Sequence, residues 1–482
     1  MTTDGILVVD VGTSGVRAAI VRSDASVTDE QYVETLPTSP APGLVEFDAT
    51  RIAAAAMDVA QAALVAGGPV AAVGIANQRA STVVWDRATG RPVGPGIGWQ
   101  DLRTVGTCLV LQSDGIRLAP NLSATKAAFL LDTYDPDRTH DLCFGTVDSW
   151  IAWTLSNGAA HVTDATNAAL TGLRTADQTT WNDGILDALR IPRSCLPQVV
   201  DSTGVCAQAT ALPGKPPIAG IAGDQQASLV GQGCLEPGLA KVTFGTGGML
   251  DMCLGARPSF DARGAGGTFP IVAWQRNGER MWGLEAVMLS AGSNVEWLRD
   301  DLGLIASAPE SHDVAARCTS SDGVVYVPAL LGLGTPEWDY GARGTLLGIT
   351  RGSERPHIVR AVLEGIAHRG ADLVEAAERD GALTIPALRV DGGMSANPTF
   401  IQALADASQK PVEVSPVLEA TTLGAGFLAG LAVGTWTDLG EIAGTWAPRL
   451  TVDPGSALDR AQWAAAVSRA KAWIPELSGL DF

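Results

Sequence analysis

The sequence has few basic residues and no cluster of them. Its 482 residues include 33 Lys and Arg against 52 Asp and Glu, which gives a formal net charge of −19. A nucleic-acid interface needs a concentrated basic face, so this composition argues against DNA and RNA as partners. Hydrophobic residues make up 46% of the chain and charged residues 18%, a balance typical of globular rather than disordered proteins.

Paired cysteines and clustered histidines are also lacking. The seven Cys are widely spaced without a Cys-x-x-Cys motif, and the five His are scattered. This spacing argues against a disulfide framework and against a structural metal site. It predicts reduced thiols and a cytoplasmic location.

No basic segment precedes the apolar run near the N-terminus, so no secretory signal is visible. One uncharged run, residues 420–437, is about long enough to span a membrane, but it carries several Gly and Thr. We therefore expect a buried helix that packs closely through small residues, and no membrane association.

The length of the chain exceeds what one hydrophobic core usually organises, so we expect two domains. A Pro- and Gly-rich break at 213–217 precedes a predicted strand, and we place the boundary near Pro237. The predicted domains are residues 1–236 and 237–482.

The stretch 218–250 contains the strongest chemical signal in the sequence. Asp224 follows an apolar, glycine-flanked run, and the turn Gly245-Thr246-Gly247 comes shortly afterwards. A carboxylate at the end of a buried strand is a candidate general base, and the exposed backbone N–H groups of a Gly/Thr turn suit phosphate oxygens. A helix-capping Asp followed by an ordinary hairpin would give the same local pattern.

A similar hairpin occurs near the N-terminus. The pattern of residues 5–36 predicts a strand, a turn, a strand, a loop and a third strand. The first turn carries Gly and Thr, as does the turn within residues 240–253, which makes a weak internal repeat. Two such hairpins facing each other would form a two-sided phosphate clamp. The residues at the first turn are Asp10, Gly12, Thr13, Ser14, Gly15 and Arg17.

Residues 48–66 are predicted to form a helix capped by Asp48, and a buried strand is predicted at 70–76. Polar residues follow this strand directly. Open α/β sheets bind ligands at the carboxyl ends of their strands, so Asn77-Gln78-Arg79 is a candidate ligand site. Trp99, Asp101 and Arg103 would add a flat wall and donors suited to a hydroxyl-rich ligand. Taken singly, Trp99 is better explained as a core residue and Arg103 as part of a surface ion pair.

Further elements are predicted along the chain. Residues 121–132, 141–155 and 285–302 are expected to be helical, the last after a Gly292-Ser293-Asn294 cap, and Pro356 begins an amphipathic helix. A strand at 387–391 runs into Gly392-Gly393, against which a flat ligand such as adenine could lie. A tight strand-to-helix turn would explain the same residues.

The ordered motifs together resemble the FGGY family of carbohydrate kinases, and within it they are closest in pattern to the glycerol kinases. The resemblance covers about residues 5–440, and its motifs lie at 74–93, 145–158, 161–172, 221–232, 242–248, 342–352, 388–397 and 421–434. It implies an α/β chain with the two-domain, actin-like sugar kinase (ribonuclease H-like) fold. Each domain would hold a mixed five-stranded sheet, with a cleft between the domains. The implied activity is ATP- and Mg²⁺-dependent transfer of phosphate to an alcohol group.

The resemblance also implies roles for individual residues. Asp224 would be the general base, and Asp10 would hold Mg²⁺ through water. The nucleotide would be bound in the C-terminal domain and the acceptor in the N-terminal one. The implied nucleotide-binding residues are Thr13, Ser14, Gly15, Arg17, Gly245, Thr246, Gly292, Glu296, Gly393 and Asn397. Thr13, Ser14 and Gly15 would meet the γ-phosphate and Arg17 the β-phosphate, and Glu296 stands where glycerol kinases carry Gln.

The acceptor site departs from the glycerol kinase pattern. Arg79, Trp99, Asp224 and Gln225 match it, but Ala80 replaces an expected Glu, Asn121 an expected Tyr, and Met249 an expected aromatic residue. Loss of one charge-assisted hydrogen bond weakens binding by about 1.5–3 kcal/mol, or roughly 10- to 150-fold. The three replacements are smaller or more flexible, so we expect a roomier pocket that favours a polyol or ketose of four or five carbons.

Glycerol kinase activity, which yields glycerol 3-phosphate, is the main alternative to that prediction. A catalytically silent sugar sensor is a more distant one, as is a nucleotide-driven chaperone or filament protein of the same fold, although the acceptor residues argue against both. Related kinases are often dimers or tetramers, so the resemblance implies a homodimer or homotetramer, but no interface signature is visible.

Overall fold

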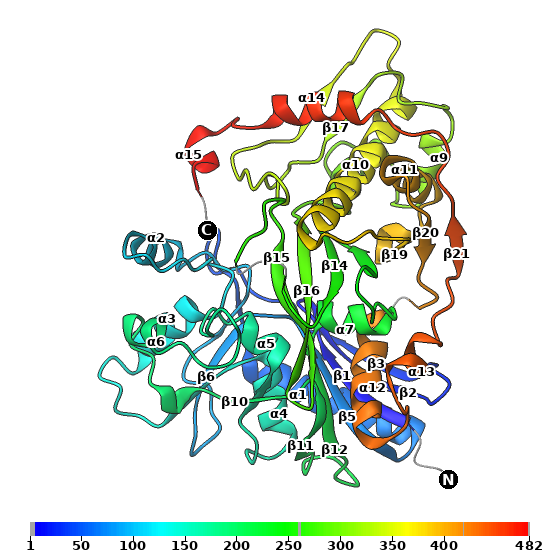
Figure 1. The fold of residues 1–482 in the computed structure, drawn as a ribbon. Coiled ribbons are helices and arrows are strands. Elements are labelled where there is room, and N and C mark those ends of the chain that lie inside the picture. Colours follow the sequence, from blue (N-terminus) through cyan, green and yellow to red (C-terminus); the bar gives the residue numbers. More distant parts are fainter. Residues whose placement is uncertain (1–4, 259–261, 418, 481–482) are drawn as a thin grey trace.

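The computed structural model describes residues 5–258, 262–417 and 419–480. The outer ends of the two predicted domains, residues 1–4 and 481–482, lie outside these ranges. The chain forms one large mixed β-sheet with helices packed on it (Figure 1). All seven Cys are free thiols, as the sequence predicts.

Two five-strand units with the same strand directions make up most of this sheet. Each has two antiparallel pairings followed by two parallel ones, in the orders β3-β2-β1-β5-β12 and β16-β14-β13-β19-β20. This repeat confirms the predicted α/β class with a mixed five-stranded sheet in each half. The first unit comprises β1 (Gly5–Val11), β2 (Gly15–Val21), β3 (Val27–Glu34), β5 (Val70–Asn77) and β12 (Pro217–Gly223). The second comprises β13 (Ala240–Phe244), β14 (Gly248–Gly255), β16 (Glu279–Met288), β19 (Leu388–Asp391) and β20 (Val412–Val414).

Three further strands extend and join the two units. β11 (Thr203–Gln208) flanks β12, β15 (Phe269–Arg276) flanks β16, and β21 (Leu450–Val452) flanks β20. β11 and β15 meet at the pair Thr203 and Arg276, where Ser202 N donates to Gln275 O at 2.9 Å. The two units therefore merge into one 13-stranded sheet, a junction that the sequence does not predict.

Short strands form smaller sheets beside the main one. One sheet orders β4 (Glu46–Phe47), β7 (Gly96–Ile97), β6 (Thr82–Asp86) and β8 (Leu142–Thr146). Two pairs complete the set, β10 (Gln198–Val200) with β9 (Val162–Asp164), and β17 (Val325–Val327) with β18 (Thr345–Leu347). The first of these sheets carries the loop with Trp99 next to the main sheet.

The helices surround the sheets. In the first half they are α1 (Ala49–Gly67), α2 (Val105–Ser113), α3 (Ala124–Tyr134), α4 (Val147–Leu155), α5 (Ala165–Ala169), α6 (Asp183–Ala188) and α7 (Asp224–Gly231). In the second half they are α8 (Ser293–Asp300), α9 (Glu310–Ala315), α10 (Arg355–Gly381), α11 (Pro398–Ser408), α12 (Ala420–Val433), α13 (Leu439–Ala443), α14 (Arg460–Ala470) and α15 (Pro475–Ser478). The described residues also form two 3₁₀ turns, η1 (Arg193–Cys195) and η2 (Gly393–Ala396).

Helix α1 shows how local sequence sets an element. Asp48 caps it by accepting hydrogen bonds from Thr50 N and Arg51 N, and Gly68 ends it at φ +86°. Among the described residues, α1 is the one helix long and apolar enough to cross a membrane by length and composition alone. Its apolar stripe, which includes Ile52, Ala56, Val59 and Ala63, is buried in the same core cluster as strands of the first unit, so the core of the fold accounts for that composition.

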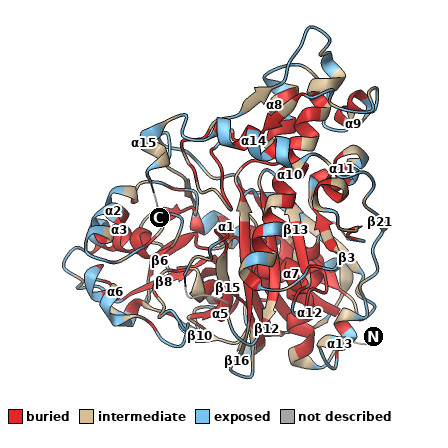
Figure 2. Cartoon of the chain, turned by 45° about the horizontal axis from the view of Figure 1, so that its top comes forward, coloured by how far each residue is buried: buried red, intermediate tan, exposed pale blue. Residues whose placement is uncertain are grey.

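Helix α12 belongs to the second half of the sequence but packs on the first unit of the sheet, beside α7 (Figure 1). Close approach of the backbones requires glycine at both helices. A Cβ on Gly424 of α12 would overlap the carbonyl oxygen of Ala227, and one on Gly231 of α7 would overlap that of Ala420. Figure 2 shows α7, α12 and the central strands largely in the colour of buried residues. The apolar run at 420–437 is thus a buried helix, as predicted.

Two helix predictions need correction. Residues 142–146 of the predicted helix 141–155 form strand β8, which pairs with β6 at Cys143 and Trp85, and the helix begins only at Val147. Helix α3 begins three residues later than predicted, whereas the helix expected after the Gly292 cap is confirmed as α8, which begins at Ser293. Short apolar runs fit a buried strand and a buried helix equally well, so tertiary pairing decides between them.

Candidate active site

Asp224, Arg79 and Asp10 lie at one edge of the sheet because their strands are parallel neighbours. β5 lies between β1 and β12, with Asn77 paired to Val11 on one side and to Gly223 on the other. Each strand is followed at this edge by the residues that the sequence singles out, as expected for a ligand site in an open α/β sheet. The structure thus brings the predicted base and the predicted acceptor residues together.

Asp224 is the first residue of α7, and its side chain is 30% exposed. Its Oδ1 accepts a hydrogen bond from Gln225 N at 2.7 Å and lies 3.3 Å from Arg79 Nε. Burial raises the pKa of the Asp224 carboxyl above its usual range, and Arg79 opposes that rise. A partly accessible carboxylate with a raised pKa and a fixed cation partner suits proton abstraction.

Arg79 joins Asp224 to a residue that the sequence analysis missed. Its Nη1 lies 2.6 Å from Glu285 Oε2, on strand β16, while its Nε faces Asp224. All three side chains are mostly shielded from solvent. Burial opposes the charged form of Arg79, but Glu285 and Asp224 outweigh it and raise the pKa of the guanidinium. Arg79 is therefore held from both sides and stays charged.

A second missed pair lies next to the first. Lys241 on β13 and Asp251 on β14 are fully buried, and Lys241 Nζ lies 2.7 Å from Asp251 Oδ2. The same Nζ donates to Gln225 Oε1 at 2.5 Å and to Thr243 Oγ1 at 3.1 Å. A charged residue inside an otherwise apolar strand, as at Lys241, Asp251 and Glu285, was the available signal for this cluster.

The predicted acceptor wall is held by a network of hydrogen bonds. Trp99 Nε1 donates to Thr13 Oγ1 at 3.3 Å, and Trp99 N donates to Ser81 Oγ at 3.0 Å. Lys126 Nζ donates to the carbonyls of Trp99 at 3.0 Å and Asn121 at 3.2 Å. Burial lowers the pKa of Lys126 to about 7. Because Lys126 binds the carbonyls of both Trp99 and Asn121, these two separately predicted residues lie close together.

The residues at which this chain departs from the glycerol kinase pattern occupy defined positions. Ala80 is buried with φ +60°, and its carbonyl accepts a hydrogen bond from Ser123 Oγ at 2.9 Å. Met249 is half-buried on β14 and, two residues from Asp251, shares its face of the strand. Asn121 is exposed just before α3. Each of the three therefore lies near a named site residue, Asn121 through the lysine that also binds the carbonyl of Trp99.

Asp101 and Arg103 form a structural pair. Asp101 is fully buried, and Arg103 Nη2 lies 2.8 Å from Asp101 Oδ2 and 2.8 Å from Glu46 Oε1. The Asp101 carboxylate also accepts a hydrogen bond from Val45 N at 2.6 Å. Their ligand role is not supported, because these contacts use the groups that a ligand would need.

The turn after β1 is tied to the acceptor loop. Gly12 N donates to Gly15 O at 2.9 Å, and Gln78 binds the turn twice, from N to Val11 O at 2.7 Å and from Nε2 to Gly12 O at 3.1 Å. Thr13 is half-buried and Ser14 is exposed at the tip. The predicted phosphate turn and the loop that carries Arg79 therefore form one unit.

Arg17 lies on β2 directly opposite Asp10. Its guanidinium forms ion pairs with Glu30, at 3.3 Å, and with Glu419, the residue before α12. It also lies 5.8 Å from the centre of the Tyr32 ring. Its predicted contact with a phosphate stays a prediction, and it would require Arg17 to exchange a carboxylate partner for the ligand.

The turn after β13 is joined to the start of α8. Gly292 N donates to Gly245 O at 2.8 Å, and Thr246 O accepts from Ala291 N at 2.7 Å. A Cβ on Gly292 would lie 2.6 Å from Gly245 O, so only glycine fits this approach. Glu296 lies in the first turn of the same helix. The predicted nucleotide residues of these two segments are thus side by side.

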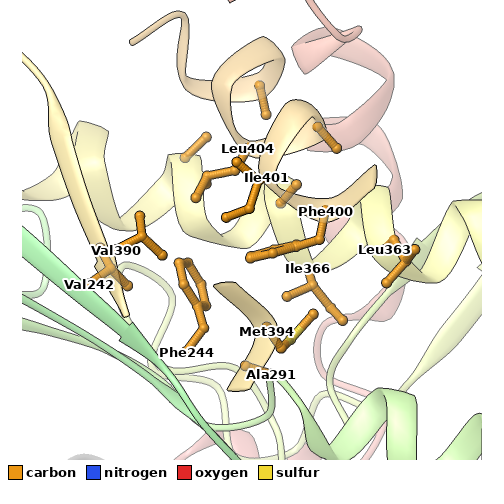
Figure 3. Packing of buried hydrophobic residues seen from close by; sticks show 14 of the residues in the cluster. Val242, Phe244, Ala291, Leu363, Ile366, Val390, Met394, Phe400, Ile401 and Leu404 are labelled. Atoms are coloured by element: carbon orange, nitrogen blue, oxygen red, sulfur yellow. The ribbon is translucent and has the colours of Figure 1, made fainter. Parts of the chain in front are cut away.

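The remaining nucleotide candidates surround η2. Gly393 is exposed and nothing lies within 4 Å of where its Cβ would be, while Asn397 caps α11 by accepting from Phe400 N at 3.1 Å. A shared core fixes these elements: Phe244, before the turn, packs edge-on against Phe400 with ring centres 4.9 Å apart, and Met394 lies beside them (Figure 3). The core therefore sets the distance between the Gly245 turn and Gly393.

Among the described residues, no three Asp, Glu, His or Cys side chains are grouped to hold a metal ion. Mg²⁺ bound with a nucleotide uses only one or two carboxylates, together with waters and phosphate oxygens. Asp10 fits that role, because burial raises the pKa of its carboxyl to about 6 and a cation would restore the charged form. Its carboxyl oxygens are hard donors of the kind that Mg²⁺ prefers.

Two surface hollows lie away from this site. One, of about 490 Å³, lies between α2, α3 and Ala188–Arg190, and the other, of about 380 Å³, lies between α10 and α14. The residues that line them include none of the predicted site residues. The buried charges at the strand ends lie apart from both hollows.

Comparison with known proteins gives matches over both halves of the chain. The N-terminal domain of the FGGY family of carbohydrate kinases matches residues 5–231, and the C-terminal domain matches residues 240–433. A glycerol kinase of Aromatoleum aromaticum is 44% identical over 494 residues, which cover 97% of this chain and 99% of that protein.

Solved structures agree with this match. The crystal structure of Plasmodium falciparum glycerol kinase with ADP has a TM-score of 0.90 at 27% identity, over 97% of this chain and 98% of that one. A ligand-bound xylulose kinase from Lactobacillus acidophilus has a TM-score of 0.84 at 21% identity, over 97% and 96% of the two chains. The second likeness shows a shared fold alone.

Proposed function

Because this chain belongs to the FGGY family of carbohydrate kinases, we propose that it transfers the γ-phosphoryl group of ATP to a terminal hydroxyl of glycerol. The products are glycerol 3-phosphate and ADP. The observation that carries the proposal is the pairing of Asp224 with Arg79 at the carboxyl ends of β5 and β12. The near-complete coverage of glycerol kinases at up to 44% identity supports glycerol as the acceptor.

In the proposed reaction Asp224 accepts the proton of the attacking hydroxyl group. The hydroxyl oxygen then bonds to the γ-phosphorus as the bond between that phosphorus and the bridging oxygen of ADP breaks. Arg79, which Glu285 holds in place, keeps Asp224 oriented and stabilises its ionised form. Trp99 and Gln225 would contact the carbon and hydroxyl groups of the acceptor.

The two hairpin turns would bind the phosphates. Backbone N–H groups near Thr13, Ser14 and Gly15 on one side, and near Gly245 and Thr246 on the other, are the donors available to phosphate oxygens. Asp10 would hold Mg²⁺, which when bound offsets negative charge on the phosphates. Gly292, Glu296, Gly393 and Asn397 would line the adenosine part of the site. We further propose residues 1–236 as the acceptor domain and 237–482 as the nucleotide domain.

A longer acceptor is the second candidate. Ala80, Asn121 and Met249 stand where glycerol kinases carry Glu, Tyr and an aromatic residue, and these replacements favour the four- or five-carbon polyol or ketose expected from the sequence. The glycerol kinase relatives weigh against that expectation, because they cover 97% of the chain. We therefore place glycerol first. A cytoplasmic location and a homodimeric or homotetrameric state stay predictions.

An acceptor panel tests the proposal. ADP release from Mg·ATP would be followed with glycerol, tetritols, pentitols, erythrulose, ribulose and xylulose as acceptors. Glycerol should give the highest kcat/KM. A four- or five-carbon acceptor that exceeds glycerol would transfer the proposal to the second candidate, and nucleotide binding without any acceptor would point to a sugar sensor.

A further inference from the structure

Lys241 has all three of its ammonium hydrogens engaged. Its Nζ contacts Gln225 Oε1 at 2.5 Å, Thr243 Oγ1 at 3.1 Å and Asp251 Oδ2 at 2.7 Å. A lysine ammonium carries three N–H donors and no acceptor, so these contacts use its full capacity. The side chain is fully buried and cannot turn toward solvent.

This contact sets the orientation of the Gln225 amide. Because Nζ bears only hydrogens, the amide atom beside it must be the carbonyl oxygen, and the NH₂ group occupies the other position. Gln225 directly follows Asp224 and is half-buried, so a ligand can reach part of it. The two adjacent residues then present different chemistry, a proton acceptor at Asp224 and a hydrogen-bond donor at Gln225.

Asp251 makes this arrangement possible. A buried, unpaired ammonium is strongly unfavourable, and Asp251 is the carboxylate in contact with Lys241. The two residues are directly paired across β13 and β14, two strands joined by the turn Gly245–Gly247. The pair therefore rests on a rigid hairpin, and a buried ion pair adds little stability over apolar residues of similar size.

We propose that Lys241, held by Asp251, is a positioning residue that presents the amide NH₂ of Gln225 to a non-reacting hydroxyl oxygen of the acceptor. The proposal rests on the kinase function proposed above and deepens it. Lys241 itself does not touch the acceptor. Its effect should appear as discrimination between acceptors that have and lack that hydroxyl group.

The test compares glycerol with propane-1,2-diol and propane-1,3-diol, each of which lacks one hydroxyl. The Lys241→Met/Asp251→Leu double variant removes both members of the ion pair together, so neither is left buried without the other. In the wild type, kcat/KM for glycerol should exceed that for the diol that lacks the recognised hydroxyl. In the double variant, kcat/KM for glycerol divided by kcat/KM for that diol should fall by about tenfold, which is the effect of one hydrogen bond. The same ratio for the other diol should stay unchanged.

Gln225→Leu should change the same ratio, and adding it to the double variant should change the ratio no further, because both act on one interaction. Lys410→Met is a control, since Lys410 also forms an ion pair of 2.7 Å in the same half, with Glu378, which is not one of the predicted site residues. Thermal unfolding verifies that each variant is folded.

Unchanged ratios, or an equal loss for all three acceptors in a folded double variant, would overturn the positioning role. If the wild type instead prefers another polyol, the glycerol proposal fails alone, and the same ratios with that polyol and its deoxy analogues decide the role of Lys241. A wild-type chain that phosphorylates no acceptor would overturn both proposals.

Discussion

Asp251 and Glu285 lie directly opposite each other on β14 and β16. Each carboxylate contacts one cation, Asp251 contacting Lys241 and Glu285 contacting Arg79. Those cations in turn contact Gln225 and Asp224, two consecutive residues at the start of α7. Two neighbouring ion pairs, Asp251–Lys241 and Glu285–Arg79, therefore support the predicted base and the residue after it. Only Arg79, on the acceptor loop, comes from the first half of the chain.

The pH dependence of activity should respond in opposite directions to loss of Arg79 and of Glu285. Asp224 must be ionised to accept a proton, so kcat/KM should fall as pH drops through its raised pKa. Arg79 lowers that pKa and Glu285 raises it. Arg79→Gln should therefore move the acid limb to higher pH, and Glu285→Gln should move it to lower pH. Profiles of kcat/KM against pH for the wild type and both variants measure these shifts. Shifts of the acid limb in the same direction for both variants would contradict this account.

Ala80→Glu should improve glycerol as an acceptor. The resemblance places a Glu at this position in glycerol kinases, and Ala80 already adopts φ +60°, so the backbone accepts a residue with a Cβ there. One added charge-assisted hydrogen bond predicts a KM for glycerol lower by about tenfold or more. Ala80→Gln, which has the same length without the charge, is the control. A rise in KM with the Glu variant would show that the acceptor lies elsewhere or that the pocket cannot hold the side chain.

Gly393→Ala should weaken ATP binding without affecting stability. No atom lies within 4 Å of the added Cβ, and Gly393 has no positive φ, so the free protein accommodates the methyl group. If adenosine lies against this glycine, the methyl group would collide with it and raise the KM for ATP by about tenfold, which corresponds to roughly 1.4 kcal/mol. Unfolding temperature and the KM for glycerol serve as internal controls. An unchanged KM for ATP would remove Gly393 from the nucleotide site.

Gly424→Ala should destabilise the protein, because its Cβ would overlap the Ala227 carbonyl where α12 crosses α7. Overpacking of this kind destabilises by about 1–3 kcal/mol or more. Gly106→Ala in α2 is the matched control. Nothing lies within 4 Å of its Cβ, and alanine is favoured over glycine in a helix by about 0.5–1 kcal/mol. Denaturant unfolding of both variants measures the difference, and equal stability would contradict the close helix contact.

The parts of the fold that the sequence predicts well are local. The hairpins at 5–21 and 240–255 follow from apolar strands around Gly/Thr turns, and Asp224 follows from a carboxylate after an apolar strand. Strand β8 was mistaken for helix because its five apolar or small residues become a strand only by pairing with β6.

The supporting charges were missed for a different reason. Lys241, Asp251 and Glu285 find partners across strands or on distant segments, and sequence spacing does not show such contacts. The remaining signal in the sequence is a single charged residue within an apolar strand. Such a residue is more often exposed on the surface than part of a buried ion pair. The junction of β11 with β15 is likewise a tertiary contact between segments without a local signature.

The most direct test of the account is the rate of ADP formation from Mg·ATP and glycerol with the wild type and with Asp224→Asn. The wild type should turn over only when glycerol is present, and the variant should lose about 10²- to 10⁴-fold in kcat while keeping its unfolding temperature. A folded Asp224→Asn variant with a near-normal rate would contradict the assignment of Asp224 as the base.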